Sequence, residues 1–146
     1  MFRIPNRGIR EGDKLMDQKM EIRFAGGKKV YTDYQGFTIQ TDQSIEDGGD
    51  NTAPTPSDLF FASLATCSGL YALRFCESRK IDTAELKISM ELQSHPQTHM
   101  VEKIVFKIIL PPEFPEKYTP ALIKSINLCY VKKHFEQPPE FEFELG

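Results

Sequence analysis

Three cysteines and three histidines are the side chains of this 146-residue sequence best suited to chemistry. Cys67 lies in the apolar segment "TPSDLFFASLATCSGLYALRFCESRK", residues 55–80, with small residues on both sides that would let a substrate approach the sulfur. Free cysteine is also among the most buried residue types and often acts as a small core residue. Helical periodicity alone leaves both interpretations of Cys67 open. We predict that Cys76, about two and a half turns further on, is core filler that cannot pair with Cys67 in one straight helix.

The histidines offer weaker patterns. His95 and His99 are four residues apart, but Pro96 places them in a turn rather than on a helix. With His134 and the cysteines they form no closely spaced pair of ligands typical of zinc. A nucleophilic pair formed by Cys129 and His134 is no better supported by the sequence than a zinc site. We therefore predict that all three histidines lie on the surface and that the chain needs no metal.

Composition limits the class of protein. The chain has a net charge of −3, 40% hydrophobic and 27% charged residues, which is ordinary for one globular domain. An acidic chain without a basic stripe argues against nucleic acid as a partner. An odd number of cysteines, without a CxxC pair or an apolar leader, favours the reducing cytoplasm over a secreted disulfide framework.

The periodicity predicts an α+β domain over residues 19–146 with the order βββ-α-ββ-α-β. Residues 1–18 are predicted to be a polar N-terminal arm or a vector-derived extension. Three strands are expected within residues 20–42, a hairpin within 86–110 and a last strand at 141–145. Thr55 and Thr119 each precede a proline and are expected to cap the two helices. Asp58 stands at the capping-box position of the first helix.

The first helix is apolar on nearly every side. Arg74 and several hydroxyl residues interrupt the apolar run, so a core helix explains it better than a membrane span, and we expect no membrane partner. Such a helix must be covered all round. Two small antiparallel sheets from one chain would not suffice, so we expect a homodimer.

Two motifs carry a family resemblance over residues 20–146. "TPSDLFFASLATCSG" and "INLCYVKKHF" resemble the first and second signatures of the OsmC/Ohr family. The resemblance implies an intertwined homodimer in which two cysteines meet at the interface. It further implies a thiol peroxidase, with Cys67 as the peroxidatic and Cys129 as the resolving cysteine. The implied substrates are organic hydroperoxides, the reductant is a dithiol, and no cofactor is needed.

One part of the family's pattern differs here. Its peroxidases place a glutamate directly after the proline of the first motif, where it holds a catalytic arginine. This chain has Ser57 there and Asp58 next, with no arginine between Arg23 and Arg74. Ser57 and Asp58 are candidate supporting residues, although Asp58 would equally serve as a charge at the helix N-terminus. Three early cations are candidates for the missing activator: Arg23, Lys28 and Lys29.

Two other functions remain open from the sequence. The dimer could be a binding module that holds an apolar small molecule, with passive or redox-sensing cysteines. The thiols could also handle persulfide or another sulfur compound, a reaction that the sequence does not separate from peroxide reduction.

Overall fold

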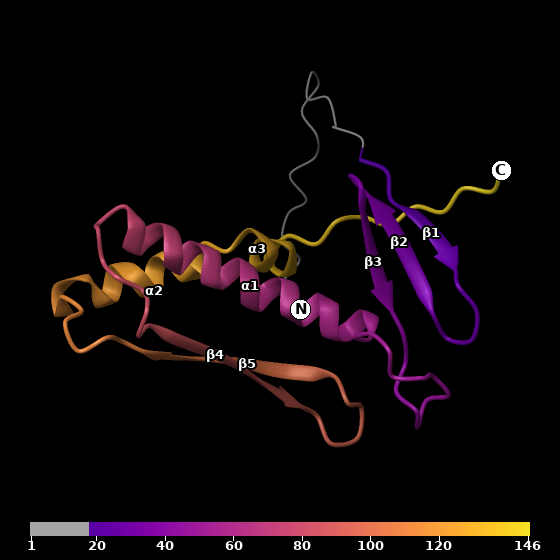
Figure 1. Cartoon of the computed structure of the whole chain (residues 1–146), viewed down its shortest axis with the longest axis horizontal. Coiled ribbons are helices and arrows are strands. Elements are labelled where there is room, and N and C mark those ends of the chain that lie inside the picture. Colours follow the sequence, from indigo (N-terminus) through magenta and orange to yellow (C-terminus); the bar gives the residue numbers. More distant parts are fainter. Residues whose placement is uncertain (1–17) are drawn as a thin grey trace. The chain divides into compact units, whose positions relative to one another are not determined.

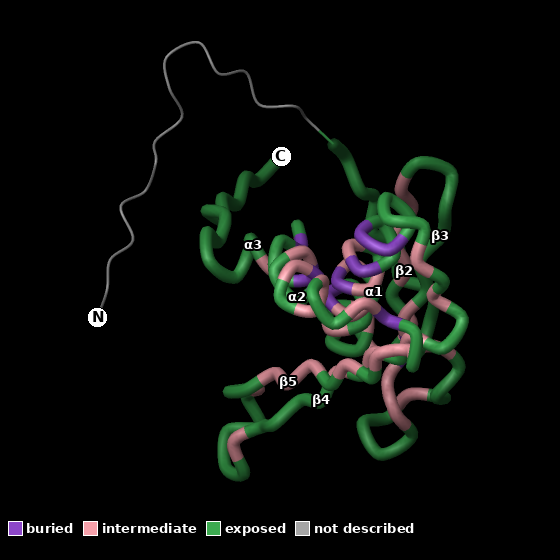
Figure 2. Tube along the Cα trace, turned by 90° about the vertical axis from the view of Figure 1, so that its left-hand side faces the viewer, coloured by how far each residue is buried: buried purple, intermediate pink, exposed green. Residues whose placement is uncertain are grey.

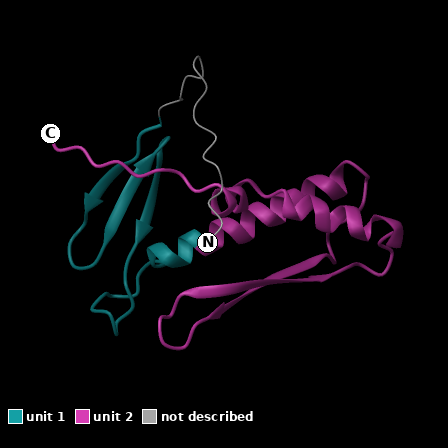
Figure 3. Ribbon diagram, turned by 180° about the vertical axis from the view of Figure 1, so that it is seen from behind, with its two compact units in different colours: residues 1–60 teal, residues 61–146 magenta. Residues whose placement is uncertain are grey.

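A computed structural model describes residues 18–146, so the predicted arm at 1–18 lies outside the described residues except for its last member. The chain forms two compact units, residues 1–60 and residues 61–146 (Figure 3). The described residues have an α+β fold with two separate antiparallel sheets.

The first unit contains a three-stranded meander, as predicted (Figure 1). Its strands β1 (Glu21–Phe24), β2 (Val30–Tyr34) and β3 (Phe37–Thr41) pair in sequence order. Gly26 and Gly27 form the first turn with φ angles of 91° and 58°, a region that favours glycine. The prediction is confirmed. It rests on the alternation of apolar and polar residues between turns, a pattern that depends only on residues close together in the sequence.

The loop that follows β3 is built around a buried carboxylate. Asp42 is fully buried, and its oxygens accept hydrogen bonds from the backbone N–H groups of Gln43 (2.8 Å), Asp50 (3.2 Å) and Thr52 (3.0 Å). The Thr52 hydroxyl donates a further bond of 2.7 Å. A Cβ atom on Gly49 would lie 2.1 Å from the Gln43 carbonyl oxygen, so the loop closes too tightly for any side chain there.

These hydrogen bonds make the stability of the first unit dependent on pH. The backbone and hydroxyl groups of Thr52 are the main causes that hold the pKa of Asp42 well below its usual value. A carboxyl with a depressed folded-state pKa contributes stability above its unfolded pKa, near ~3.9, and loses it as pH falls. We expect Asp42→Asn to lower the melting temperature at pH 7 by about 5 °C or more, and this difference to shrink below pH ~4.

Thermal unfolding of the parent and of Asp42→Asn between about pH 2.5 and about pH 7, a range that spans the unfolded-state pKa of ~3.9, measures this effect. Asp47→Asn is the matched control, because Asp47 lies exposed in the same loop and bonds only the neighbouring Ser44 hydroxyl and its own turn. A constant difference between Asp42→Asn and the parent at all pH values would contradict the role of the charge.

The long helix α1 (Pro56–Glu77) begins as predicted. Asp58 accepts bonds from the Thr55 N–H (2.9 Å) and hydroxyl (2.8 Å), while the Asp58 N–H donates to the Thr55 hydroxyl (3.2 Å). This reciprocal capping box satisfies N–H groups that the first turn cannot pair. The helix ends at Glu77, and Lys80 then takes a left-handed conformation with φ of 54°.

The predicted hairpin is also present. Strands β4 (Lys87–Ser94) and β5 (Val101–Ile109) pair antiparallel, with Ile88 opposite Ile108 and Met90 opposite Phe106. These four side chains share one face and are partly buried. Alternation of apolar and polar residues is sufficient to predict such a face.

The second helical region differs from the prediction. A 3-10 turn, η1 (Glu116–Tyr118), leads directly into α2 (Thr119–Asn127), so Thr119 lies inside the helix rather than capping it. Tyr118 occupies the cap position and makes no side-chain cap bond. The chain then breaks at Leu128 and starts a separate helix, α3 (Tyr130–Glu136).

The core of the second unit joins α1 to α2. The trace in Figure 2 is purple where residues are buried. The buried cluster contains Ala72, Phe75, Cys76, Phe114, Leu122 and Ile126. Ile88 and Ile108 of the hairpin pack against this cluster. Cys76 is fully buried within it, and burial raises the pKa of its thiol, which agrees with the prediction of core filler.

The predicted last strand is wrong. Residues 137–146 form no strand, and Phe141, Phe143 and Leu145 are 82%, 92% and 103% exposed. An alternating pattern specifies which residues could share a face, but a strand needs a neighbour to complete its hydrogen-bond ladder. Residues 18–136 of the same chain supply no such strand to this segment.

Helix α1 buries one face rather than its whole circumference. Leu64, Ser68 and Ala72 are buried, whereas Leu70 and Leu73 are 41% and 39% exposed. Among the described residues, α1 is the helix long and apolar enough to cross a membrane, by length and composition only. Core helices of globular proteins meet the same criterion, and the buried face of α1 packs in such a core.

Candidate functional site: a cysteine pair between helices

Cys129 lies where α2 gives way to α3. The Leu128 and Cys129 N–H groups bond back to the carbonyls of Ser125 (3.0 Å) and Ile126 (3.2 Å), which closes α2. The Cys129 sulfur then accepts the Lys132 N–H at 3.4 Å and caps α3. Its side chain is fully buried. The break that the periodicity missed therefore fixes the direction in which this thiol points.

The structure brings Cys129 against α1. Its sulfur lies 4.0 Å from the carbonyl oxygen of Leu64, which is 65 residues earlier in the chain. The Cys67 side chain lies close enough to Cys129 to lower the pKa of the Cys129 thiol. Cys67 follows Leu64 by three residues, so it stands at the edge of the buried face of α1 and is partly exposed. The two cysteines meet within a single chain, and all three cysteines are reduced.

Ser68 completes the arrangement. It is 2% exposed, and its side chain helps to lower the pKa of the neighbouring Cys129 thiol. Sequence reasoning noted Ser68 only as a small neighbour of Cys67. The available signal was its spacing, because Ser68 lies one helical turn after the buried Leu64.

Two opposing effects act on the acidity of Cys129. Burial, the largest single effect, raises the pKa of its thiol because it disfavours a charged sulfur. Four neighbouring groups lower this pKa and together prevail: the Cys67 side chain, the Lys132 N–H, the Ser68 side chain and the Val131 N–H. The pKa of the Cys129 thiol is therefore lowered. A thiolate is the reactive form of cysteine.

An apolar cavity of about 440 Å³ adjoins the pair. Three residues near Cys129 also line the cavity: Leu64, whose carbonyl oxygen lies 4.0 Å from the sulfur, Lys132, whose N–H donates to that sulfur, and Ser68. The other walls come from β5, α2 and α3, and they consist of Ile104, Phe106, Ile108, Ile123, Ile126, Asn127 and Phe135. The only charged side chain in the lining is Lys132, whose ammonium group bonds Asn127 (2.5 Å) and Glu136 (3.1 Å). The cavity suits an apolar group close to the sulfur atoms.

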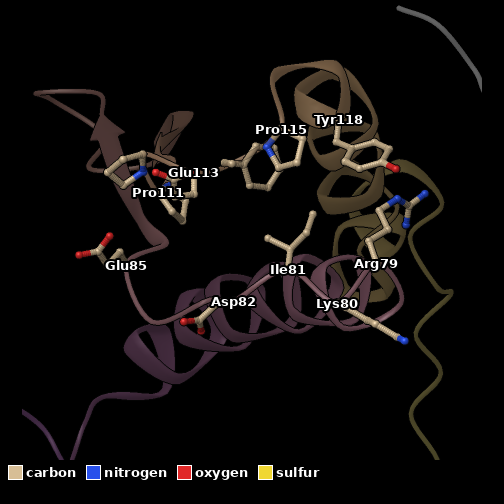
Figure 4. Close-up of a pocket in the computed structure, with 11 residues that line it drawn as sticks. Arg79, Lys80, Ile81, Asp82, Glu85, Pro111, Glu113, Pro115 and Tyr118 are labelled. Carbon is tan, nitrogen blue, oxygen red and sulfur yellow. The ribbon is translucent and has the colours of Figure 1, made fainter.

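A larger cavity of about 610 Å³ lies between residues 79–85 and 111–118 (Figure 4). The Arg79 guanidinium stands 3.8 Å from the ring centre of Phe75 and 5.3 Å from that of Tyr118. Its lining mixes this cation with carboxylates such as Asp82 and Glu85. No cysteine lines either cavity, but Leu64 and Lys132, which contact the Cys129 sulfur, line the smaller one, so the site is assigned to it.

The supporting residues predicted from the motif stand in the first turn of α1, within the first unit. Asp58 is engaged in the capping box, and its hydrogen bonds with Thr55 lower the pKa of its carboxyl. Ser57 is exposed in the first turn of α1. All the candidate activating cations belong to the first unit. Arg23 pairs with Asp33, Lys29 pairs with Asp50, and Lys28 is exposed.

The histidines take surface positions, as predicted. His95 and His99 sit in the β4–β5 turn, where His95 Nδ1 accepts backbone N–H groups. His134 Nδ1 lies 2.9 Å from the Tyr130 carbonyl oxygen on α3. Within residues 18–146, no group of three or more His, Cys, Asp or Glu side chains could hold a metal ion.

The sequence profile of the OsmC-like protein family matches residues 48–144, the stretch that carries both cysteines, the hairpin and the three helices of the second unit. The chain belongs to the OsmC-like protein family. No curated protein matches it by sequence.

Solved structures share the fold of this OsmC-like chain. An osmotic stress induced and detoxification response protein of Psychrobacter arcticus is 19% identical, with a TM-score of 0.67 over 84% of this chain and 90% of that one. A hypothetical protein of Aquifex aeolicus is 16% identical, with a TM-score of 0.62 over 86% and 92%. An organic hydroperoxide resistance protein OsmC of Legionella pneumophila, also described as a predicted redox protein, is 16% identical, with a TM-score of 0.54 over 84% and 91%.

Proposed function

We propose that this OsmC-like protein reduces organic hydroperoxides with its cysteine pair. The contact between Cys67 and Cys129 carries the proposal, because a reaction through a disulfide needs two thiols that can reach each other. Cys67 is the peroxidatic residue, since it is partly exposed whereas Cys129 is fully buried. The hydroperoxide resistance protein among the structural neighbours supports the same chemistry.

The reaction has two oxidative steps and one reductive step. The Cys67 thiolate attacks a peroxide oxygen and becomes a sulfenic acid, while the other oxygen leaves as an alcohol. Cys129 then attacks the Cys67 sulfur, which releases water and forms a disulfide. A dithiol reductant restores both thiols by exchange. The chemistry uses no metal and no organic cofactor.

The adjoining cavity sets the class of substrate. Its walls are mainly Ile, Leu and Phe side chains, which gain free energy by burying an alkyl or aryl group. Hydrogen peroxide offers no such group. We therefore propose a preference for organic hydroperoxides over hydrogen peroxide.

One equivalent of an organic hydroperoxide at neutral pH should consume two thiols per chain and form a Cys67–Cys129 disulfide. Mass spectrometry of the non-reduced peptides tests this, with the untreated protein and Cys76 as internal references. Cys67→Ser is the decisive variant. The proposal fails if thiol loss in Cys67→Ser equals that of the parent, or if the disulfide joins another pair.

We also propose that the protein is a homodimer. The chain alone exposes apolar side chains on β1, on β3 and along the C-terminal segment, including Phe24 (87%), Phe37 (72%) and Phe143 (92%). A second copy could provide the ladder that residues 141–145 lack, in line with their alternation. Light scattering at micromolar concentration should give twice the mass of one chain. A mass of 16.7 kDa would contradict the proposal.

The apolar cavity also favours a second candidate function, a binding module for a hydrophobic small molecule. In that case a ligand would copurify with the protein, and a hydroperoxide supplied with a dithiol would not be turned over. Native mass spectrometry of the purified protein, combined with the disulfide assay, distinguishes the two functions.

A further inference from the structure

The larger cavity of the second unit takes no part in the chemistry proposed above. It has a volume of about 610 Å³ and lies between the turn that follows α1 and the segment that joins β5 to α2 (Figure 4). Sites for small molecules are typically clefts of roughly 300–1,000 Å³. Its described lining contains no cysteine, so its role is separate from that of the thiols.

The charged side chains of this cavity gather at two ends. The lining contains two cations, Arg79 and Lys80, and three carboxylates, Asp82, Glu85 and Glu113. Figure 4 shows the two cations at one end of the cavity, and Asp82 and Glu85 at the other. Within residues 18–146, none of these five side chains forms a salt bridge. Their charges are therefore available to a ligand.

The Arg79 guanidinium is held in place from one side. It stacks 3.8 Å from the ring centre of Phe75 and 5.3 Å from that of Tyr118. Its Nη1 donates to the Phe75 carbonyl (3.4 Å) and to the Ser78 hydroxyl (2.9 Å). Nε and Nη2 make no hydrogen bond to any described residue. These two neighbouring donors form the fork that binds a carboxylate through two parallel hydrogen bonds.

Asp82 is oriented in a similar way at the other end. Its Oδ1 accepts the Ala84 N–H at 3.0 Å, the bond of an Asx turn. The second oxygen, Oδ2, makes no bond to any described residue. Glu85 adds a second negative charge to this end of the cavity. A cationic group such as an ammonium would be attracted to both carboxylates.

The lining between the charged ends is apolar. Figure 4 shows Ile81 between the two ends, with its side chain directed into the cavity. Phe114 is 9% exposed, and three prolines, Pro111, Pro112 and Pro115, complete the apolar part of the lining. A hydrocarbon group that covers these side chains gains free energy by leaving water.

We propose that this cavity binds a short peptide with free ends. Arg79 binds its carboxylate, Asp82 binds its ammonium group, and an apolar side chain of the peptide covers Ile81. A ligand with negative charge alone would meet the three carboxylates, and a ligand with positive charge alone would meet Arg79 and Lys80. The inference goes beyond the proposed function, because no step of peroxide reduction uses this cavity.

Blocked forms of one peptide test each end without any change to the protein. The probes are alanyl-phenylalanine and alanyl-alanyl-phenylalanine, each with free ends, with an acetylated amino group, or with an amidated carboxyl group. Each is titrated into the isotope-labelled full chain. Nitrogen–proton correlation spectra then give the dissociation constant and identify the residues whose signals move.

We expect at least one free peptide to bind in the millimolar range or more tightly, and to move the signals of residues 79–85 and 111–118. Acetylation and amidation should each weaken binding about fivefold, as for a partly exposed ion pair. Three results would overturn the proposal: no binding of either peptide at about 10 mM, a blocked form that binds as well as the free one, or signal changes confined to the cavity beside Cys129.

Two charge variants assign the ends. Arg79→Gln should remove the preference for the free over the amidated peptide and keep the preference for the free over the acetylated peptide. Asp82→Asn should do the reverse, and its amide oxygen can still accept the Ala84 N–H. A loss of affinity that is equal for all three forms of the peptide would overturn both assignments.

Lys117→Gln and Glu116→Gln are the matched controls. Lys117 stands 5.0 Å from the ring centre of Tyr118, the same ring that Arg79 approaches, and Glu116 precedes it, but neither lines the cavity. Both variants should leave every dissociation constant within about twofold, as for surface changes outside the site. Control variants that weaken binding as much as Arg79→Gln and Asp82→Asn would contradict a site at this cavity.

Discussion

Cys67→Ser is expected to lower the rate of organic hydroperoxide reduction by at least about a thousandfold, because it removes the nucleophile on which every later step depends. The serine hydroxyl keeps nearly the same shape but does not ionise near neutral pH. Cys129→Ser should have a different effect. Its Cys67 would still be oxidised, but without its partner the sulfenic acid would persist.

A coupled assay with a dithiol reductant measures the turnover, and a cyclic 1,3-diketone traps the sulfenic acid for mass spectrometry. We expect the trapped adduct on Cys67 in Cys129→Ser and little of it in the parent. Cys76→Ala is the matched control, since Cys76 lies in the core cluster and should affect folding rather than turnover per folded molecule. Equal turnover in Cys67→Ser and the parent would remove Cys67 from the mechanism.

Leu122→Ala is expected to lower the free energy of unfolding of the second unit by about 3 kcal/mol. The Leu122 side chain is fully buried, and it belongs to the cluster in which α2 packs against Phe75 and Cys76 of α1. Truncation loses the transfer free energy of the removed carbon atoms and leaves a cavity that close-packed neighbours fill only in part.

Urea unfolding followed by the helical circular dichroism signal measures this loss, with the protein concentration held constant in case of dimerisation. Ile123→Ala is the matched control, because Ile123 is the next residue of α2 and is 52% exposed. We expect it to cost less than about 1 kcal/mol, as it removes less buried surface. A loss in Ile123→Ala as large as in Leu122→Ala would contradict the assignment of the core. The same packing aligns α2 with α1, so Leu122→Ala should also weaken the Cys67–Cys129 contact.

Much of the secondary structure was predictable because its causes are local. The capping box of Thr55 and Asp58 involves residues three apart, and the β4–β5 hairpin follows from alternation on each side of a turn. The motif resemblance correctly indicated the family, and it singled out two cysteines among three.

The errors all arose where a local pattern depends on distant structure. Thr119 has the composition of a helix cap, but the preceding 3-10 turn extends the helical chain past it. The alternation at 141–145 predicts a strand, yet no described neighbour pairs with it. The break at Leu128 is invisible to periodicity, because apolar residues continue through it at helical spacing.

By itself the sequence determined the element types up to the end of α2, the family, and the identity of the two candidate thiols. Only the tertiary structure decided that Cys67 and Ser68 lie beside Cys129 within one chain, and that an apolar cavity adjoins residues that contact Cys129. The physical reason is that hydrogen bonds within a turn or helix depend on neighbouring residues. The acidity of Cys129, in contrast, depends on burial and on donors from two helices, which packing brings to one sulfur atom.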